Sequence, residues 1–218
     1  MGISNQAMKI IDLSHEVRIG MPTYPGDAPV VVRQERSVVR DGFALTSLAM
    51  TSHVGTHVDV PAHLFADAPG LHAMTPEAFV GKAATADCSG AAGRAVTPDD
   101  LASLAEVDGL EFVLIRTGWD RHWGSPRYFK GYPPLSIEAC RFLASLNLRG
   151  VGLDCPSPDP ADSTELSAHR ELLKGGMVVV ENLCNLHALP ESGFLFSALP
   201  LRIRDGDGSP VRAVGILL

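Results

Sequence analysis

Three of the eight histidines in this 218-residue chain stand close together, around a single aspartate. The segment is HVGTHVDVPAH, and it contains His53, His57, Asp59 and His63. Imidazole and carboxylate groups together suit Zn, Mn or Fe(II), and geometry and metal availability decide among these ions. The alternative is a polar strand face whose histidines make ordinary hydrogen bonds. So many donor groups in so short a segment favour a metal site.

The spacing of these four residues predicts an extended chain rather than a helix. On a helix, at about 100° per residue, Asp59 would point about 200° away from His57. Gly55 and Pro61 also oppose a helix through this stretch. All four positions are odd, so a strand with a period of two would place their side chains on one face. Bends at Gly55 and Pro61 could then wrap these side chains around one point.

Two residues far along the chain are candidate partners of this cluster. His169 lies in SAHRELL, within an expected helix, and Glu181 lies in VVVENL, on the expected strand that follows. An acid on such an apolar strand would be costly if it were buried and unpaired, and a bound cation would remove that cost. Taken alone, Glu181 could be an exposed acid at a strand end and His169 an ordinary helix-surface residue. Together with the first cluster, they are expected to contribute to the same site.

The elements that must position these residues follow from short apolar runs separated by Gly and Pro. Strands are expected at residues 8–13, 30–39, 43–52, 82–88, 111–118, 150–154, 177–183, 199–205 and 211–218. Helices are expected from Thr97 and over 136–146 and 164–174. The second half alternates strand and helix, and no linker interrupts the chain. The sequence therefore predicts one mixed α/β domain over residues 1–218.

Composition excludes several classes of function. A formal charge of −7 and a pI near 5.6 argue against nucleic acid, which needs a basic face. No run of about 18 uncharged apolar residues predicts a membrane span, and the N-terminus lacks the apolar stretch of a signal peptide. The four cysteines are too scattered for a disulfide framework or a thiolate site and are expected to be small buried hydrophobes. We therefore expect a reducing cytoplasm, and we interpret the residues before Met8 as an extension.

The remaining polar positions have simpler interpretations. Four histidines lack comparable neighbours and are expected at the surface or behind the site: His15, His72, His122 and His187. The glycine-rich stretch at 204–214 lacks the P-loop and EF-hand patterns and is interpreted as a tight turn between strands. Asp154 follows an expected strand, where it could orient a metal ligand or form a turn.

With these residues in view, the sequence resembles the metal-dependent cyclase/hydrolase family that includes bacterial kynurenine formamidases and isatin hydrolases. The family hallmark, HxGTHxDxPxH, is matched at every fixed position of residues 53–63. The resemblance also takes in DLSHEV (12–17), MPTYPGD (21–27) and GVGLDCPSPDP (150–160). It implies a swivelling β/β/α fold, usually assembled as a homodimer or a larger homo-oligomer, and a small-molecule substrate.

The resemblance also implies roles for individual residues. Five would bind one or two divalent ions, Zn or Mn: His53, His57, Asp59, His169 and Glu181. Asp59 would bridge the two ions, His63 would move protons, and Tyr24 would line the substrate pocket. Formamidases tend to carry Trp where Tyr24 stands, so the resemblance leaves the substrate open.

The activity expected from these roles is hydrolysis of an amide, an N-formyl group, or a cyclic amide or ester. A metal-activated water would attack, and His63 would be the base. One alternative is an Fe(II) oxygenase built on His57, Asp59 and His169, although it leaves His53 and His63 unexplained. Another is a non-catalytic binding protein, which would not need His63. The aromatic loop at 119–134 is expected to be either a lid or a dimer interface.

Overall fold

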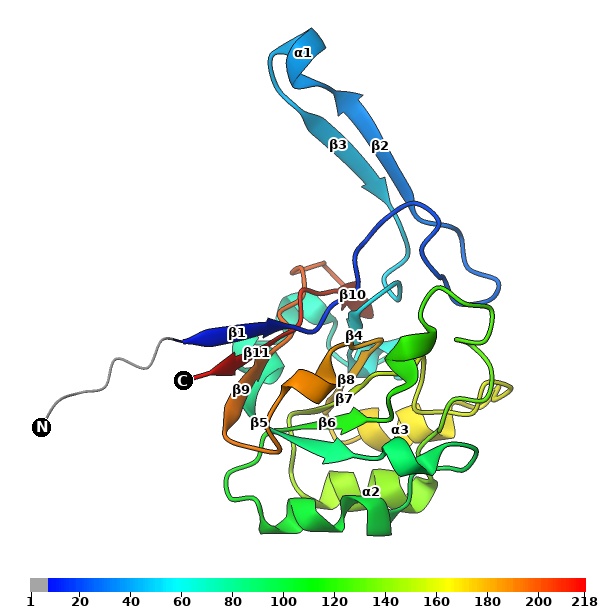
Figure 1. The fold of residues 1–218 in the computed structure, drawn as a ribbon, viewed down its shortest axis with the longest axis vertical. Coiled ribbons are helices and arrows are strands. Elements are labelled where there is room, and N and C mark those ends of the chain that lie inside the picture. Colours follow the sequence, from blue (N-terminus) through cyan, green and yellow to red (C-terminus); the bar gives the residue numbers. More distant parts are fainter. Residues whose placement is uncertain (1–7) are drawn as a thin grey trace, which may run out of the picture.

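The computed structural model describes residues 8–218, so the interpretation of the segment before Met8 lies outside the described residues. Within them, a nine-stranded sheet has the order β1-β11-β9-β5-β6-β7-β8-β4-β10 (Figure 1). Its strands are β1 (Lys9–Asp12), β4 (His57–Asp59), β5 (Val80–Asp87), β6 (Phe112–Arg116), β7 (Gly150–Leu153), β8 (Val178–Glu181), β9 (Phe194–Ser197), β10 (Gly208–Pro210) and β11 (Val214–Leu217).

The middle of this sheet is parallel and deeply buried. Strands β5, β6, β7 and β8 pair in parallel, and antiparallel strands extend the sheet on both sides. Residues of β7 and β8 are buried throughout, as expected for parallel strands covered on both faces. The expected α/β class with a mixed sheet is confirmed.

Side chains at alternate positions of the strands pack into two hydrophobic cores, one on each face of the sheet. Val113, Val151 and Val179 pack on one face with α2 (Ile137–Ser145) and α3 (Ser167–Leu173). Val58 and Val180 point to the other face, where they pack with residues of β9 and the N-terminal strand. Because successive side chains of a strand alternate, the residues next to Val58 must face α3.

A separate two-stranded sheet projects from the body of the molecule (Figure 1). It consists of β2 (Val31–Arg36) and β3 (Leu45–Ala49), joined through the short helix α1 (Val38–Asp41). The expected strand at 30–39 therefore ends early. Ser37 caps a helical turn by accepting a hydrogen bond from the Arg40 amide, and Gly42 closes that turn at φ +81°.

Several expected elements differ in the structure. The stretch 53–63 is not extended throughout: His57–Asp59 is a strand, a turn precedes it, and Pro61–His63 is a 3-10 helix. The segment 199–205 forms no strand beyond a bridge at Pro200, and the neighbouring strand is β10 instead. The expected α-helix from Thr97 is a 3-10 helix, which begins with a Thr97–Asp100 capping box.

The remaining short elements are 3-10 helices. They are η1 (Pro61–His63), η2 (Leu71–Ala73), η3 (Pro76–Phe79), η4 (Ser89–Ala91), η5 (Pro98–Glu106), η6 (Trp119–His122) and η7 (Leu186–Ala188). Helix α3 is shorter than expected because Leu166 adopts a left-handed conformation, φ +50°, just before it. Among residues 8–218, no helix has the length and apolarity needed to cross a bilayer. The four cysteines are buried and unpaired, as expected.

Candidate metal centre

Strand register brings the first three site residues together. His57 and Asp59 are two residues apart on β4, so both project from the face opposite Val58. In the antiparallel pairing of β4 with β8, His57 is directly opposite Glu181. Cross-strand partners share a face and have adjacent side chains. The apolar strand β8 thereby places a carboxylate beside an imidazole in the protein interior.

Helix α3 contributes His169 from the same side of the sheet. Asp159 accepts hydrogen bonds from the backbone amides of Ala168 and His169, and its carboxylate lies 2.6 Å from His169 Nδ1. Asp159 thus holds both the first turn of the helix and the orientation of the imidazole. With Nδ1–H donated to Asp159, the lone pair of His169 Nε2 points toward the cluster.

His57 is held in the same way by the backbone. Its Nδ1 lies 2.8 Å from the carbonyl oxygen of Gly55, which also accepts a hydrogen bond from the Asn182 side chain. Gly55 has φ +62°, and a Cβ there would lie 2.8 Å from the terminal methyl carbon of Met21. Glycine therefore suits the left-handed turn, and any larger side chain would also have to displace the end of Met21. The result is a second imidazole whose Nε2 faces inward.

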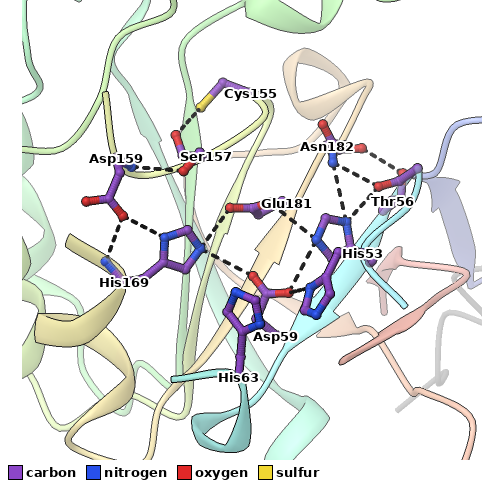
Figure 2. Close-up of polar contacts among 12 residues, drawn as sticks. His53, Thr56, Asp59, His63, Cys155, Ser157, Asp159, His169, Glu181 and Asn182 are labelled. Atoms are coloured by element: carbon purple, nitrogen blue, oxygen red, sulfur yellow. Dashed lines mark hydrogen bonds and ion pairs between the residues drawn. The ribbon is translucent and has the colours of Figure 1, made fainter. Parts of the chain in front are cut away.

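Two imidazole nitrogens and two carboxylates thus converge on one small volume (Figure 2). His57 Nε2 lies 3.3 Å from an oxygen of Asp59 and 3.3 Å from one of Glu181. His169 Nε2 lies 3.4 Å from the second oxygen of Asp59 and 3.0 Å from that of Glu181. We call these four residues the inner cluster; each is at most 6% exposed. The Glu181 Oε1 atom is buried without a hydrogen-bond partner.

The electrostatics of the inner cluster call for a cation. Burial alone would lower the pKa of His57, but the Asp59 and Glu181 carboxylates outweigh it and raise that pKa to about 10. Burial would likewise lower the pKa of His169, but the carboxylates of Asp159, Asp59 and Glu181 outweigh it and hold that pKa well above its ordinary value. Nitrogen lone pairs this close to buried carboxylates are repulsive, so each Nε2 must hold either a proton or a metal ion. Histidine and carboxylate donors fit a divalent metal ion.

A second group of residues lies nearer to solvent. His53 Nδ1 lies 2.6 Å from Asp59 Oδ1, and His53 Nε2 lies 2.8 Å from Asp207 Oδ2. His63, at the end of η1, has its ring centroid 4.2 Å from that of His53 and its Nδ1 3.6 Å from Asp207 Oδ2. We call His53, His63 and Asp207 the outer cluster. Three overlapping groups of potential metal ligands therefore run through the site, and Asp59 belongs to two of them.

Sequence analysis missed three of the residues that build this site. Strand β10 brings Asp207 to His53. Its first residue, Gly208, pairs with Asp59, and because Gly208 has no side chain there is room for the His53 ring. Asp159 and Asn182 hold His169 and the Gly55 carbonyl. The only sign of Asp207 in the sequence was its place between two glycines, Gly206 and Gly208, and that pattern is typical of turns. Asp154 was expected to form a turn or orient a ligand, and its carboxylate accepts hydrogen bonds from the backbone amides of Thr117 and Gly118.

A cavity of about 360 Å³ opens beside both clusters. Tyr24, Trp123 and Phe129 line it, together with the site histidines. Tyr24 lines this cavity, and its contact with a substrate stays a prediction. The aromatic loop is divided: Trp119, Tyr128 and Tyr132 are buried in the core, whereas Trp123 and Phe129 reach the cavity.

Comparison with known proteins assigns the chain to a family. Residues 11–160 match the Cyclase family, described as "Putative cyclase". The chain belongs to this family. The curated protein named kynurenine formamidase from Bacillus cereus is 33% identical over 205 residues, 94% of this chain and 95% of its own. The protein of the same name from Erythrobacter litoralis is 32% identical over 211 residues.

Solved structures agree with these sequence relatives. Isatin hydrolase A from Labrenzia aggregata, bound to benzyl benzoate, superposes with a TM-score of 0.88 at 28% identity over 99% of this chain and 96% of its own. A potential metal-dependent hydrolase with cyclase activity superposes with a TM-score of 0.77 at 25% identity over 96% of this chain and 98% of its own. The chain is accordingly a hydrolase of carbon–nitrogen bonds other than peptide bonds, similar to arylformamidases, and a divalent metal fits its site.

Proposed function

We propose that the protein hydrolyses a small amide, N-formyl compound or cyclic amide with two divalent ions held around Asp59. The observation that carries this proposal is the inner cluster, in which two fixed imidazoles direct Nε2 at two buried carboxylates. Without an ion, both imidazoles must bind a second proton and stay buried beside two desolvated carboxylates, an arrangement that adds little stability. A metal ion offsets this cost and is also the reagent that amide hydrolysis needs.

We assign one ion to His53, His57 and Asp59 and the second to Asp59, His169 and Glu181. These two groups have ligand atoms close enough to share an ion and overlap at Asp59. The two Asp59 oxygens point to different imidazoles, Oδ1 toward His57 and Oδ2 toward His169, as a bridging carboxylate requires. Histidine and carboxylate ligands serve Zn and Mn alike, so we propose one of these two metals.

A divalent ion, when bound, lowers the pKa of water and polarises a substrate carbonyl. Beside it, we assign the proton transfers to His63. Burial and the neighbouring His53 and His169 lower the pKa of His63 despite the Asp59 charge, so its imidazole is neutral and able to accept a proton. Asp207 faces Nδ1, which leaves Nε2 to take a proton from the attacking water and return it to the leaving nitrogen.

The direct test of this function is a hydrolysis panel on protein of known metal content. Formanilides, benzo-fused cyclic amides and aryl esters would be offered to the protein loaded with Zn or with Mn. We expect turnover of at least one amide class, lost on chelation and restored by the same ion. Full metal occupancy with no hydrolysis would contradict the proposal and favour a binding protein. Turnover that requires iron and oxygen would favour the oxygenase alternative.

We further propose that the protein is a homodimer. Apolar side chains on the projecting arm are half exposed or more, among them Val31, Val39, Phe43, Leu45 and Leu48. A two-stranded sheet is marginally stable on its own in water, and an exposed apolar patch of this kind is typical of an interface. Sedimentation of the protein and of a Phe43→Ser, Leu45→Ser variant would test this. A monomeric parent would contradict it.

The unpaired cysteines support a cytoplasmic location.

A further inference from the structure

The aromatic loop at 119–134 reaches the metal centre through one buried hydroxyl group. Tyr128 is fully buried, and its hydroxyl donates a hydrogen bond to Oδ1 of Asn182 over 2.7 Å. Asn182 directly follows Glu181, a member of the inner cluster. A buried phenol needs such a partner, because an unpaired O–H in the interior is costly. The loop is therefore tied by a polar contact to the residue beside a proposed metal ligand.

Asn182 extends this contact to His57. Its Nδ2 donates to the carbonyl oxygen of Gly55 over 2.9 Å, and the same oxygen lies 2.8 Å from Nδ1 of His57. Because a carbonyl oxygen can only accept, Nδ2 must face Gly55 and Oδ1 must face Tyr128. The Tyr128 hydroxyl must then be the donor. Each hydrogen bond thus fixes the direction of the next, from the loop to the imidazole of a proposed ligand.

The backbone of Asn182 holds its side chain in place for these contacts. Asn182 has φ +56°, a left-handed conformation that asparagine tolerates better than most residues. Its amide donates to the carbonyl oxygen of Cys155 at 3.1 Å, and its carbonyl oxygen accepts from Thr56 Oγ1 at 2.6 Å (Figure 2). With the backbone fixed, the orientation of the side-chain amide depends on its bonds to Tyr128 and Gly55.

Tyr128 also packs between two aromatic walls of the cavity. Its ring centroid lies 4.9 Å from that of Trp123 and 5.2 Å from that of Phe129, and both rings are nearly perpendicular to it. Trp123 and Phe129 line the cavity, whereas Tyr128 lies behind them. Trp123 stacks in turn on His15, whose backbone amide donates to Thr56 Oγ1. The cavity walls and the metal centre are therefore joined by one continuous set of contacts.

From these contacts we infer that Tyr128 is a positioning residue for His57. Through Asn182 it holds the Gly55 carbonyl, and with it the direction in which His57 presents Nε2. Loss of a partner behind a metal-bound histidine typically lowers metal affinity about 10–100-fold. Tyr128 acts one hydrogen bond further out, so its loss should cost less. The inference rests on the proposed metal-dependent function and assigns the aromatic loop a part in supporting one of its ligands.

Tyr128→Phe is the direct test, because it keeps the ring and removes only the hydroxyl. In competition between the Zn-loaded protein and a chelator, we expect affinity for one ion to fall about threefold to tenfold and affinity for the other to stay as in the parent. Tyr132→Phe is the matched control on the same loop. Its hydroxyl is buried without a hydrogen-bond partner among residues 8–218, so this variant should bind Zn as the parent does.

A second readout separates positioning from simple loss of a buried hydrogen bond. A merely structural role would lower the Tm of the metal-free protein and leave the gain in Tm on adding Zn unchanged. We expect that gain to shrink in Tyr128→Phe, because the gain depends on metal affinity.

A double-mutant cycle tests the route through Asn182. Asn182→Gly accepts the positive φ without strain, keeps both backbone hydrogen bonds and removes the side-chain amide. We expect a loss of Zn affinity of about tenfold. Tyr128→Phe should add no further loss in that background, because its effect passes through the missing amide.

The outcomes separate this inference from the function on which it rests. Equal Zn affinity in Tyr128→Phe and Tyr132→Phe would overturn it, and so would equal weakening of both ions or a full further loss on top of Asn182→Gly. Zn binding by the parent without hydrolysis of any amide would overturn the proposed function alone, because chelator competition does not depend on turnover. A parent that binds neither Zn nor Mn would overturn both proposals.

Discussion

The two halves of the site differ in what holds them. Each inner imidazole has a fixed partner behind it, the Gly55 carbonyl for His57 and Asp159 for His169, and these rings are almost inaccessible. The outer residues hold mainly one another, and their side chains are 22–44% exposed. His53 links the halves through Asp59 and Asp207.

This difference indicates a division of labour. Rigid, desolvated donors suit a group that must keep an ion through many turnovers, and the partly solvated His63 and Asp207 suit the exchange of protons with water and substrate. His53 belongs to both halves, because it is also a proposed ligand of one ion. The comparison predicts that inner and outer substitutions will damage different properties. The predictions below test that separation, from the largest expected effect to the smallest.

Asp59→Asn should be the most damaging substitution. It removes a buried charge that faces His53, His57 and His169 while nearly keeping the side-chain volume. We expect metal content to fall sharply and activity to fall at least about 10³-fold, the upper end of what loss of one electrostatic group costs. Elemental analysis and the hydrolysis assay would measure the two effects. An active variant with full metal content would remove Asp59 from the centre of the site.

His63→Ala should separate the two halves most clearly. We expect turnover to fall about 10²–10⁴-fold, as for loss of a general base, while metal content is unchanged. Loss of metal in this variant would make His63 a ligand.

Asp207→Asn should show a milder form of the same behaviour. Because Asp207 faces His63 Nδ1 and also holds His53, a proposed ligand, we expect a loss of about tenfold in turnover, a displaced pH profile and weaker binding of the ion at His53, with the ion at His169 and Glu181 retained. Asp205→Asn, an exposed neighbour, is the matched control and should behave as the parent. If Asp207→Asn loses both ions, the division between the halves is wrong.

Asp159→Asn tests the support behind the inner cluster. It weakens the hold on His169 Nδ1 without touching any proposed ligand atom. We expect metal affinity to fall about 10–100-fold, as for other partners of metal-bound histidines. Competition with a chelator would measure the affinity, and Asp162→Asn, on the same loop and exposed, is the control. Equal affinities in the two variants would contradict the supporting role.

Metal removal should destabilise the fold moderately. An ion that is present at about 100 times its Kd adds about 2.7 kcal/mol, so chelation should lower Tm by about 6–10 °C in a chain of this size. The shift should be absent in Asp59→Asn, which lacks the ions already. A shift of the same size in that variant would assign the stabilisation to another site.

Much of this site could be predicted from the sequence because its residues are concentrated. The donors of residues 53–63 stand out by type alone, and Glu181 stands out as an acid on an apolar strand. The local path of residues 53–63 could not be predicted in the same way, because odd positions suggest one strand face. The structure instead uses a turn at Gly55, a three-residue strand and a 3-10 helix.

The supporting acids could not be predicted because their partners are set by tertiary structure. Asp207 reaches His53 only through the pairing of β10 with β4, and 154 positions separate the two residues. Asp159 lies in a proline-rich loop whose course depends on the packing of α3. The helix at Thr97 was recognised by its cap, but propensity did not separate α from 3-10 geometry there.

The number of ions per chain in the parent and in Glu181→Ala tests the central claim most directly. Elemental analysis of protein purified without added metal should give two ions of Zn or Mn in the parent. Glu181→Ala should retain one, because only the group with His169 loses a ligand while His53, His57 and Asp59 remain. An unchanged ratio of metal to protein in Glu181→Ala would contradict a site in which Asp59 bridges two ions.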